Sequence, residues 1–198
     1  MTEEQPKAVL HRYLKMAREA IVWKLEGLSE SEIRRPMVPT GTNLLGLVKH
    51  LGSVEFGYFG LVFGRPPDEP IPWWDSGADP NDDMWARASE SRDQVVAFYR
   101  RSWRHSDRTI DELDLTAAGR VPWWPEGRNE PTLHALLIHV IAETNRHAGH
   151  ADILRELIDG AVGLHADNSN LPSSDPAWWQ AYRDRLEEVA SQFDPTDI

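Results

Sequence analysis

The stretch Pro131–Gly160, PTLHALLIHVIAETNRHAGHADILRELIDG, decides how this 198-residue chain is interpreted. Its length and apolar periodicity are those of one long helix. At about 100° per residue, four polar side chains fall within roughly 80° of arc on that helix, namely His139, Glu143, His147 and His150. Leucine, isoleucine and valine flank the same stripe, so these polar groups face partly into a packed interior. Buried ionisable groups need partners, and a divalent metal can serve several of them at once.

The spacing of Glu143 and His147 favours a metal site. The two residues are four apart, so both side chains can reach one ion from the same helical face. A third ligand from another helix would complete an open site with positions left for water or substrate. His50 is the natural candidate because it lies in the middle of a second apolar helix. Structural alternatives stay open: a core histidine with one hydrogen bond for His50, and an ion pair with Arg146 or His147 for Glu143.

Other side chains give less specific patterns. His139 lies one turn before Glu143 and is interpreted as structural. Arg155 is a candidate contact for an anionic cofactor, although acidic neighbours on the same helix also favour ion pairs three or four residues apart. Trp73 and Trp124, from two proline-rich loops, are candidate pocket walls.

Three further long helices are expected outward from this stretch. Apolar periodicity predicts these three helices at about residues 5–27, 42–64 and 81–113, and the stretch described above forms the fourth, at 131–160. The third contains a possible break at 102–107, and an Asp-Pro pair at 79–80 is its expected start signal. Ser29 and Glu32 have the spacing of a capping box and predict a short helical turn before Pro36.

Together these elements predict an all-α fold, a four-helix bundle with a C-terminal helical appendage. The bundle is expected to form one domain over residues 1–163. Residues 164–198 are expected to form a linker and a last helix, about 176–192, that packs on or near the bundle. No segment alternates as a strand would.

Composition excludes several classes of function. The formal net charge of −11 argues against a nucleic-acid partner, because phosphate contacts need a basic surface. No run approaches the ~20 apolar residues of a transmembrane helix, and the N-terminal MTEEQPKAVL lacks the features of a secretory signal. We therefore expect a cytoplasmic protein without a membrane partner. The chain has no cysteine, so thiol chemistry would have to come with a soluble cofactor.

Two segments match a known superfamily. GTNLLGLVKHLGSVE at 41–55 and HVIAETNRHAGHADILRELIDG at 139–160 resemble the DinB/YfiT-like superfamily. They are most similar to an actinobacterial branch related to the mycothiol-dependent maleylpyruvate isomerase. KLEGLSESEIRRPMVPTGT at 24–42 is also typical of that branch.

The resemblance implies a fold, a metal and a dimer. Members are up-down-down-up four-helix bundles, usually dimeric, that bind a divalent metal, commonly zinc or nickel. The resemblance implies that His50, Glu143 and His147 are the metal ligands. His150 stands where many relatives have glutamine, which places it beside a ligand or facing the substrate. The tail does not resemble the C-terminal domain of the isomerase, so maleylpyruvate is not the expected substrate.

Three functions remain open. The first is a metal-dependent transferase or isomerase that joins mycothiol, or another small thiol, to a small electrophilic substrate, with His150 or a bound water handling the proton. The second is a metal-dependent hydrolase. The third is a non-catalytic, stress-associated bundle in which the metal supports the fold.

Overall fold

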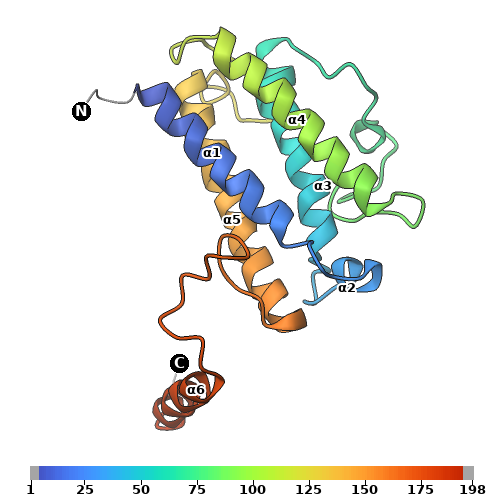
Figure 1. Ribbon diagram of the computed structural model, residues 1–198. Helices are drawn as coiled ribbons and strands as arrows, with labels where there is room; N and C mark the ends of the chain where they lie inside the picture. The colour runs from blue at the N-terminus through green and yellow to red at the C-terminus, as the bar shows by residue number, and fades with distance from the viewer. Residues whose placement is uncertain (1–4, 194–198) are drawn as a thin grey trace.

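The computed structural model describes residues 5–193. Its α-helices are α1 (Pro6–Trp23), α2 (Glu30–Arg34), α3 (Leu44–Glu55), α4 (Arg92–Glu112), α5 (Leu133–Asp159) and α6 (Pro176–Ala190) (Figure 1). Over the same residues only isolated bridges join extended backbone, Ala118 with Thr132 and His165 with Asn168. The all-α prediction is therefore confirmed. The ends of the two predicted domain ranges, 1–4 and 194–198, lie outside the described residues, and the division itself stays a prediction.

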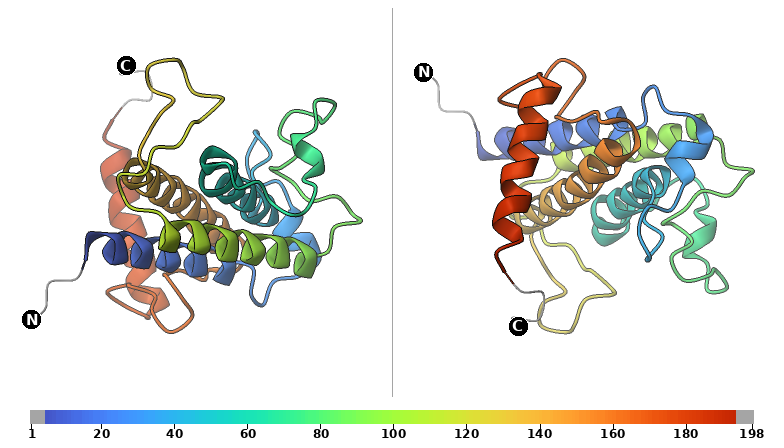
Figure 2. Two further views of the ribbon diagram at one scale, coloured as in Figure 1. Left: turned by 90° about the horizontal axis from the view of Figure 1, so that it is seen from above. Right: turned by 90° about the horizontal axis from the view of Figure 1, so that it is seen from below.

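The four long helices form an up-down-down-up bundle. In Figure 1, α1 and α5 run in one direction and α3 and α4 in the other. Lys7, at the start of α1, donates to the backbone carbonyls of Asp111 and Leu113 at the end of α4, as antiparallel neighbours require. The closest packing is of α1 on α5 and of α3 on α4 (Figure 2). The bundle is thus made of two helix pairs that meet along a seam.

Capping side chains define where the helices begin. Ser29 and Glu32 form the predicted capping box of α2. Ser91 and Gln94 form a second box at the start of α4, and Thr132 caps α5 by accepting from the backbone N–H of Ala135. Each side-chain oxygen satisfies an N–H that the helix itself leaves without a partner.

The predicted start of the third long helix at residue 81 is wrong. Asn81 has φ 62°, in the left-handed region, which a helix cannot contain. The box at Ser91 starts α4 instead, so residues 64–91 form a long crossover with one 3₁₀ turn, η3 (Pro72–Trp74). The possible break at 102–107 is also wrong, because α4 is continuous over this stretch.

The second predicted helix changes geometry in its last turns. α3 continues through a π-helical turn, η1 (Phe56–Gly60), and a 3₁₀ turn, η2 (Leu61–Phe63). Another segment approaches this helix most closely at Gly46, where a Cβ atom would lie 1.8 Å from the carbonyl oxygen of Met84. Only glycine lets the crossover pass this close to α3.

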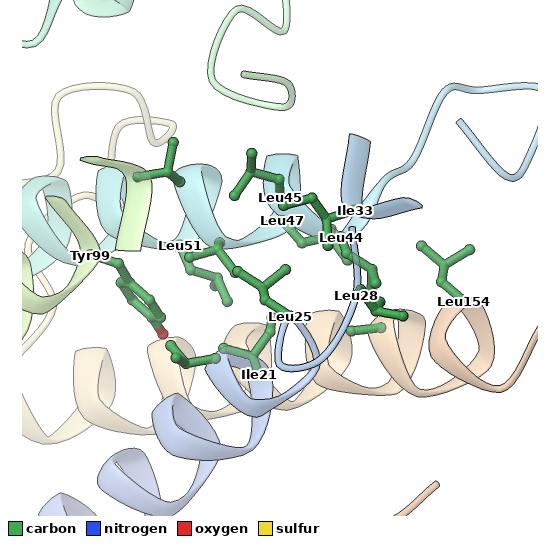
Figure 3. Packing of buried hydrophobic residues seen from close by; sticks show 14 residues of the cluster. Ile21, Leu25, Leu28, Ile33, Leu44, Leu45, Leu47, Leu51, Tyr99 and Leu154 are labelled. Carbon is green, nitrogen blue, oxygen red and sulfur yellow. The ribbon is translucent and has the colours of Figure 1, made fainter. Parts of the chain in front are cut away.

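Apolar side chains from five segments fill the interior. Figure 3 shows one cluster in which leucines of α3 meet Ile21 of α1, Ile33 of α2, Tyr99 of α4 and Leu154 of α5. A second cluster includes Phe59 and several residues of α5. Burial of this apolar surface, at about 25 cal/mol per Å², supplies the main driving force for the bundle.

A buried ion pair joins α1 to α3. Arg18 contacts Glu55 at 2.6 Å with both side chains almost fully enclosed, and it also contacts Asp107 of α4 at 2.7 Å. His11 reaches the same Asp107 carboxylate at 2.7 Å. These charges are retained inside the bundle because each has a hydrogen-bonded counter-charge.

The last helix is not part of the bundle interior. None of the residues of α6 is buried, and Figure 1 shows the helix beyond the end of α5, at the end of an extended linker. Among the described residues, none of the helices combines the length and apolar character that a bilayer-crossing segment requires.

Candidate metal centre

Three predicted ligands converge at the seam between the helix pairs. His50 comes from α3, and Glu143 and His147 come from α5. Nε2 of His147 lies 3.0 Å from Oε1 of Glu143, and Nε2 of His50 lies 3.8 Å from the same oxygen. One ligand atom from each residue falls within 4.8 Å of the other two. Three donors this close can reach one cation from one side.

Asp83 holds His50 in the orientation that this convergence needs. Its Oδ2 lies 2.7 Å from Nδ1 of His50, so Nε2 of His50 is turned toward Glu143. The hydrogen bond from His50 lowers the pKa of Asp83, which keeps the carboxylate ionised. A carboxylate behind a ligating histidine is a recurrent feature of metal sites, where it fixes the tautomer and the ring orientation.

The role of Asp83 was missed in the sequence. The acidic run 79–83 falls at the predicted start of the third long helix, whereas the structure places it in the crossover between α3 and α4. Asn43 donates to the carbonyl of Met84 at 3.2 Å and fixes the segment that follows Asp83. The sequence signal at Asp83 was a run of acidic residues, and its position over α3 could not be predicted from the sequence.

His147 is the most enclosed member of the group. Burial lowers its pKa, and proximity to His50 lowers it further. The neutral imidazole, which is the form that binds a metal, is therefore favoured. Nδ1 of His147 faces Nδ1 of His150 at 3.3 Å, while Nε2 faces Glu143. His150 itself is exposed and touches the site through His147, so its predicted catalytic role stays a prediction.

A pocket of about 620 Å³ opens beside the three residues. Its walls combine the site with aromatic and apolar side chains, and they include His50, Glu143, Asp83, His139, Val54, Gly57, Tyr58, Leu61, Trp74 and Trp123. The tryptophans that line it are each one residue away from the predicted pair. Trp73 instead packs against Phe98 and donates to Ser53 Oγ at 2.7 Å.

Tyr58 organises the aromatic wall. Its hydroxyl accepts hydrogen bonds from the indoles of both Trp123 and Trp124, at 3.3 and 3.2 Å. The ring of His139 packs edge-on against Tyr58 at 4.8 Å and against Trp124 at 5.1 Å. The sequence signal for this aromatic surface was the tryptophan pair in a proline-rich loop.

Arg155 has a different set of contacts. Its guanidinium pairs with Asp159 at 2.7 Å and donates to the backbone carbonyls of Lys24 and Glu26 at 3.0 and 2.8 Å. It therefore fastens the C-terminal half of α5 to the end of α1. Contact with an anionic cofactor at Arg155 stays a prediction.

The donor set fits a divalent cation. Two imidazoles and one carboxylate are the ligand types that zinc, nickel and iron accept, and three protein donors leave coordination positions open. His50 and His147 each have the second ring nitrogen engaged, by Asp83 and His150 respectively. This leaves both Nε2 atoms directed at the space beside Glu143.

Comparison with known families decides where the chain belongs. A family model described as mycothiol-S-transferase matches residues 9–160, more than half of the chain. The chain belongs to the mycothiol-S-transferase family. The match covers most of α1 and all of α2 to α5, including the three converging residues, whereas the linker and α6 lie beyond it.

Solved structures support the same fold. A conserved protein from Enterococcus faecalis, known from its crystal structure, superposes with a TM-score of 0.62 at 15% sequence identity. The alignment covers 80% of this chain and 99% of that one. At this identity the likeness concerns the fold alone. A comparison with curated proteins gives no match.

Proposed function

We propose that this member of the mycothiol-S-transferase family joins the thiol sulfur of mycothiol to a small electrophile, displacing a leaving group such as halide and releasing the thiol proton, with the help of a divalent metal, zinc or nickel. The observation that carries the proposal is the convergence of His50, Glu143 and His147 within 4.8 Å beside an aromatic pocket. The family supports the thiol, and the donor set supports the metal. A thiol bound beside a divalent cation has a lowered pKa and is a better nucleophile at neutral pH.

The residues of the chain have separable tasks in this reaction. His50, Glu143 and His147 hold the cation, and Asp83 keeps the His50 ring turned toward it. Trp74, Trp123 and the ring of Tyr58 enclose the apolar part of the electrophile. The hydroxyl of Tyr58 already accepts two indole hydrogen bonds, so its own proton can be donated to a ligand in the pocket.

Three further features of the proposal concern the surroundings of the reaction. We assign to His150 the support of the His147 ring, because 3.3 Å separates their Nδ1 atoms. The partner is a small molecule that fits a pocket of about 620 Å³. A cytoplasmic location follows from the chemistry, since a free-thiol cofactor needs a compartment in which thiols stay reduced. The proposed homodimer is developed in the next subsection.

Metal content tests the first half of the proposal. We expect elemental analysis to find about one divalent metal per wild-type chain, and much less in His50→Ala. His134→Ala is the matched control, because His134 is an exposed histidine at the other end of α5. Equal metal in wild type and His50→Ala would remove His50 from the ligand set.

Turnover tests the second half. Metal-loaded protein is incubated with mycothiol and a halogenated aromatic electrophile, and loss of free thiol and halide release are followed. The control reactions omit thiol or include a chelator. Equal halide release without thiol would point to hydrolysis. No release under any condition, together with a lower melting temperature after chelation, would leave a structural metal.

A further inference from the structure

The helix α6 has an apolar face that stays exposed among residues 5–193. Four exposed side chains of the helix form a stripe, at 36–54% exposure, and they are Trp178, Tyr182, Leu186 and Val189. At about 100° per residue they fall within roughly 80° of arc. Such a stripe is the pattern of a helix that packs lengthwise on another surface. Exposed apolar patches of this kind mark interaction sites.

A groove of suitable shape runs along α1. It has a volume of about 1130 Å³ and lies between α1, α5 and the segment 164–168. Its α1 side carries an apolar row, with Tyr13 and Met16 about half exposed and Trp23 nearer the end of the helix, alongside charged residues that include Lys15 and Glu19. Along both helices the apolar side chains recur at steps of three and four residues. The two faces are therefore long enough to pack side by side.

Charge fixes the direction of packing. On α1, Lys15 precedes Glu19 along one edge of the groove. On α6, Arg185 precedes Glu188 along one edge of the apolar stripe, by helical position. An antiparallel arrangement places Arg185 near Glu19 and Glu188 near Lys15. In that register Met16 lies opposite Val189, so the apolar and charged contacts agree.

The linker directs α6 away from the groove of its own chain. A tight turn at Gly163 is held by backbone hydrogen bonds between Leu164 and Asn168 and between Asn168 and His165, at 3.1 and 2.9 Å. Lys24 ties it to α1 by donating to the Gly163 carbonyl. From this anchored turn the chain leads away from α1 (Figure 1).

We propose that α6 packs into the α1–α5 groove of a second copy of this chain, so that two copies exchange their C-terminal helices in a symmetric dimer. The second copy is the occupant because each chain offers both complementary surfaces while its anchored turn directs the helix outward. Two-fold exchange uses each surface once and leaves neither exposed. The inference is independent of the proposed reaction, since the groove shares no lining residue with the pocket beside the three ligands.

Sedimentation velocity of the full-length chain is the first test. Wild type should be a dimer. Leu186→Glu places a charge in the apolar stripe and should raise the dimer dissociation constant roughly 100-fold or more, because each dimer contains two such contacts. Gln180→Glu adds the same charge on the opposite face of α6 and should remain dimeric. Helicity by circular dichroism checks that both variants are folded. A monomeric wild type, or a Leu186→Glu variant as dimeric as wild type, would overturn the proposal.

A crosslinking test separates exchange from docking within one chain. The chain has no cysteine, so Met16→Cys and Val189→Cys introduce unique thiols. A chain with both substitutions is treated with a short bismaleimide. Exchange predicts crosslinked dimers, and mixing the two single variants predicts a crosslinked heterodimer. A monomer with both thiols consumed would show that α6 docks on its own groove and would refute the exchange.

Discussion

Gly46→Ala tests how closely the crossover is fitted to the metal site. The new methyl carbon would lie 1.8 Å from the carbonyl oxygen of Met84, where side chains rarely come within 3.0 Å. The Met84 segment must therefore move by about 1.2 Å. Overpacking of this size costs about 1–3 kcal/mol, and the strained hydrogen bond from Asn43 adds roughly 1 kcal/mol. The higher helix propensity of alanine offsets about 1 kcal/mol of this cost.

The expected net loss is about 1–3 kcal/mol, or roughly 2–12 °C in melting temperature for a chain of this size. The same displacement moves Asp83, whose contact with His50 is 2.7 Å, beyond hydrogen-bonding distance. Metal affinity should then fall by about 10–100-fold, the usual effect of removing a residue that supports a ligand. Differential scanning fluorimetry and competition with a metallochromic chelator measure the two effects.

Gly149→Ala is the matched control. Gly149 lies inside α5, and a Cβ atom there would meet nothing within 4 Å. The substitution should raise stability by about 0.5–1 kcal/mol through helix propensity and leave metal affinity unchanged. If Gly46→Ala is as stable as Gly149→Ala and binds metal as wild type does, the crossover does not depend on that close approach, and the reasoning about Asp83 fails.

Three other predictions follow from the polar contacts. Asp83→Asn should keep the fold but weaken metal binding about 10–100-fold in calorimetric titration, because His50 loses its charged partner. Burial alone would raise the pKa of Asp107, but hydrogen bonds from His11 and Arg18 hold it at about 2 against an ordinary 3.8. That carboxylate should contribute roughly 2 kcal/mol above pH 4, lost as the pH falls through 2, in urea unfolding series. Glu55→Gln should destabilise by about 3–5 kcal/mol, since Arg18 then remains buried without its main counter-charge.

Two controls accompany these variants. Asp107→Asn should unfold with a shallower pH dependence between pH 4 and 2 than wild type, and identical slopes would assign the acid sensitivity to other carboxylates. Glu112→Gln removes the exposed pair with Arg65, whose contact is 2.7 Å. It should cost less than about 1 kcal/mol. If Glu112→Gln lowers the free energy of unfolding as much as Glu55→Gln does, burial does not increase the contribution of the Arg18–Glu55 pair to stability.

Helical periodicity predicts which helix faces carry Glu143, His147 and His50, and the superfamily resemblance singles these residues out as ligands. Glu143 and His147 share a face by their spacing, and the apolar pattern around His50 turns it toward the interior, so the structure brings the three together. Asp83 could not be predicted, because its position depends on how a long crossover passes over Gly46. A tertiary contact of that kind leaves no periodic signal.

Competing local signals explain the error at the third helix. The Asp-Pro pair at 79–80 has the form of a helix start, whereas Ser91 and Gln94 form the capping box at which α4 begins. Asn81, with φ 62°, shows that the chain turns immediately after the proline. The prediction of Trp73 and Trp124 as pocket walls is wrong: their neighbours Trp74 and Trp123 line the pocket, because loop conformation decides which member of each pair faces it.

The three converging side chains come from both helix pairs, so the site spans the seam between them. His50 stands on the α3–α4 pair, whereas Glu143 and His147 stand on the α1–α5 pair. Anything that binds all three side chains therefore adds another bridge between two helix pairs that Arg18 already joins through Glu55 and Asp107. Amide hydrogen exchange in the central turns of α3 and of α5 should therefore slow together when a metal binds the three side chains. Slower exchange in both helices would show that metal binding makes the two helix pairs more rigid.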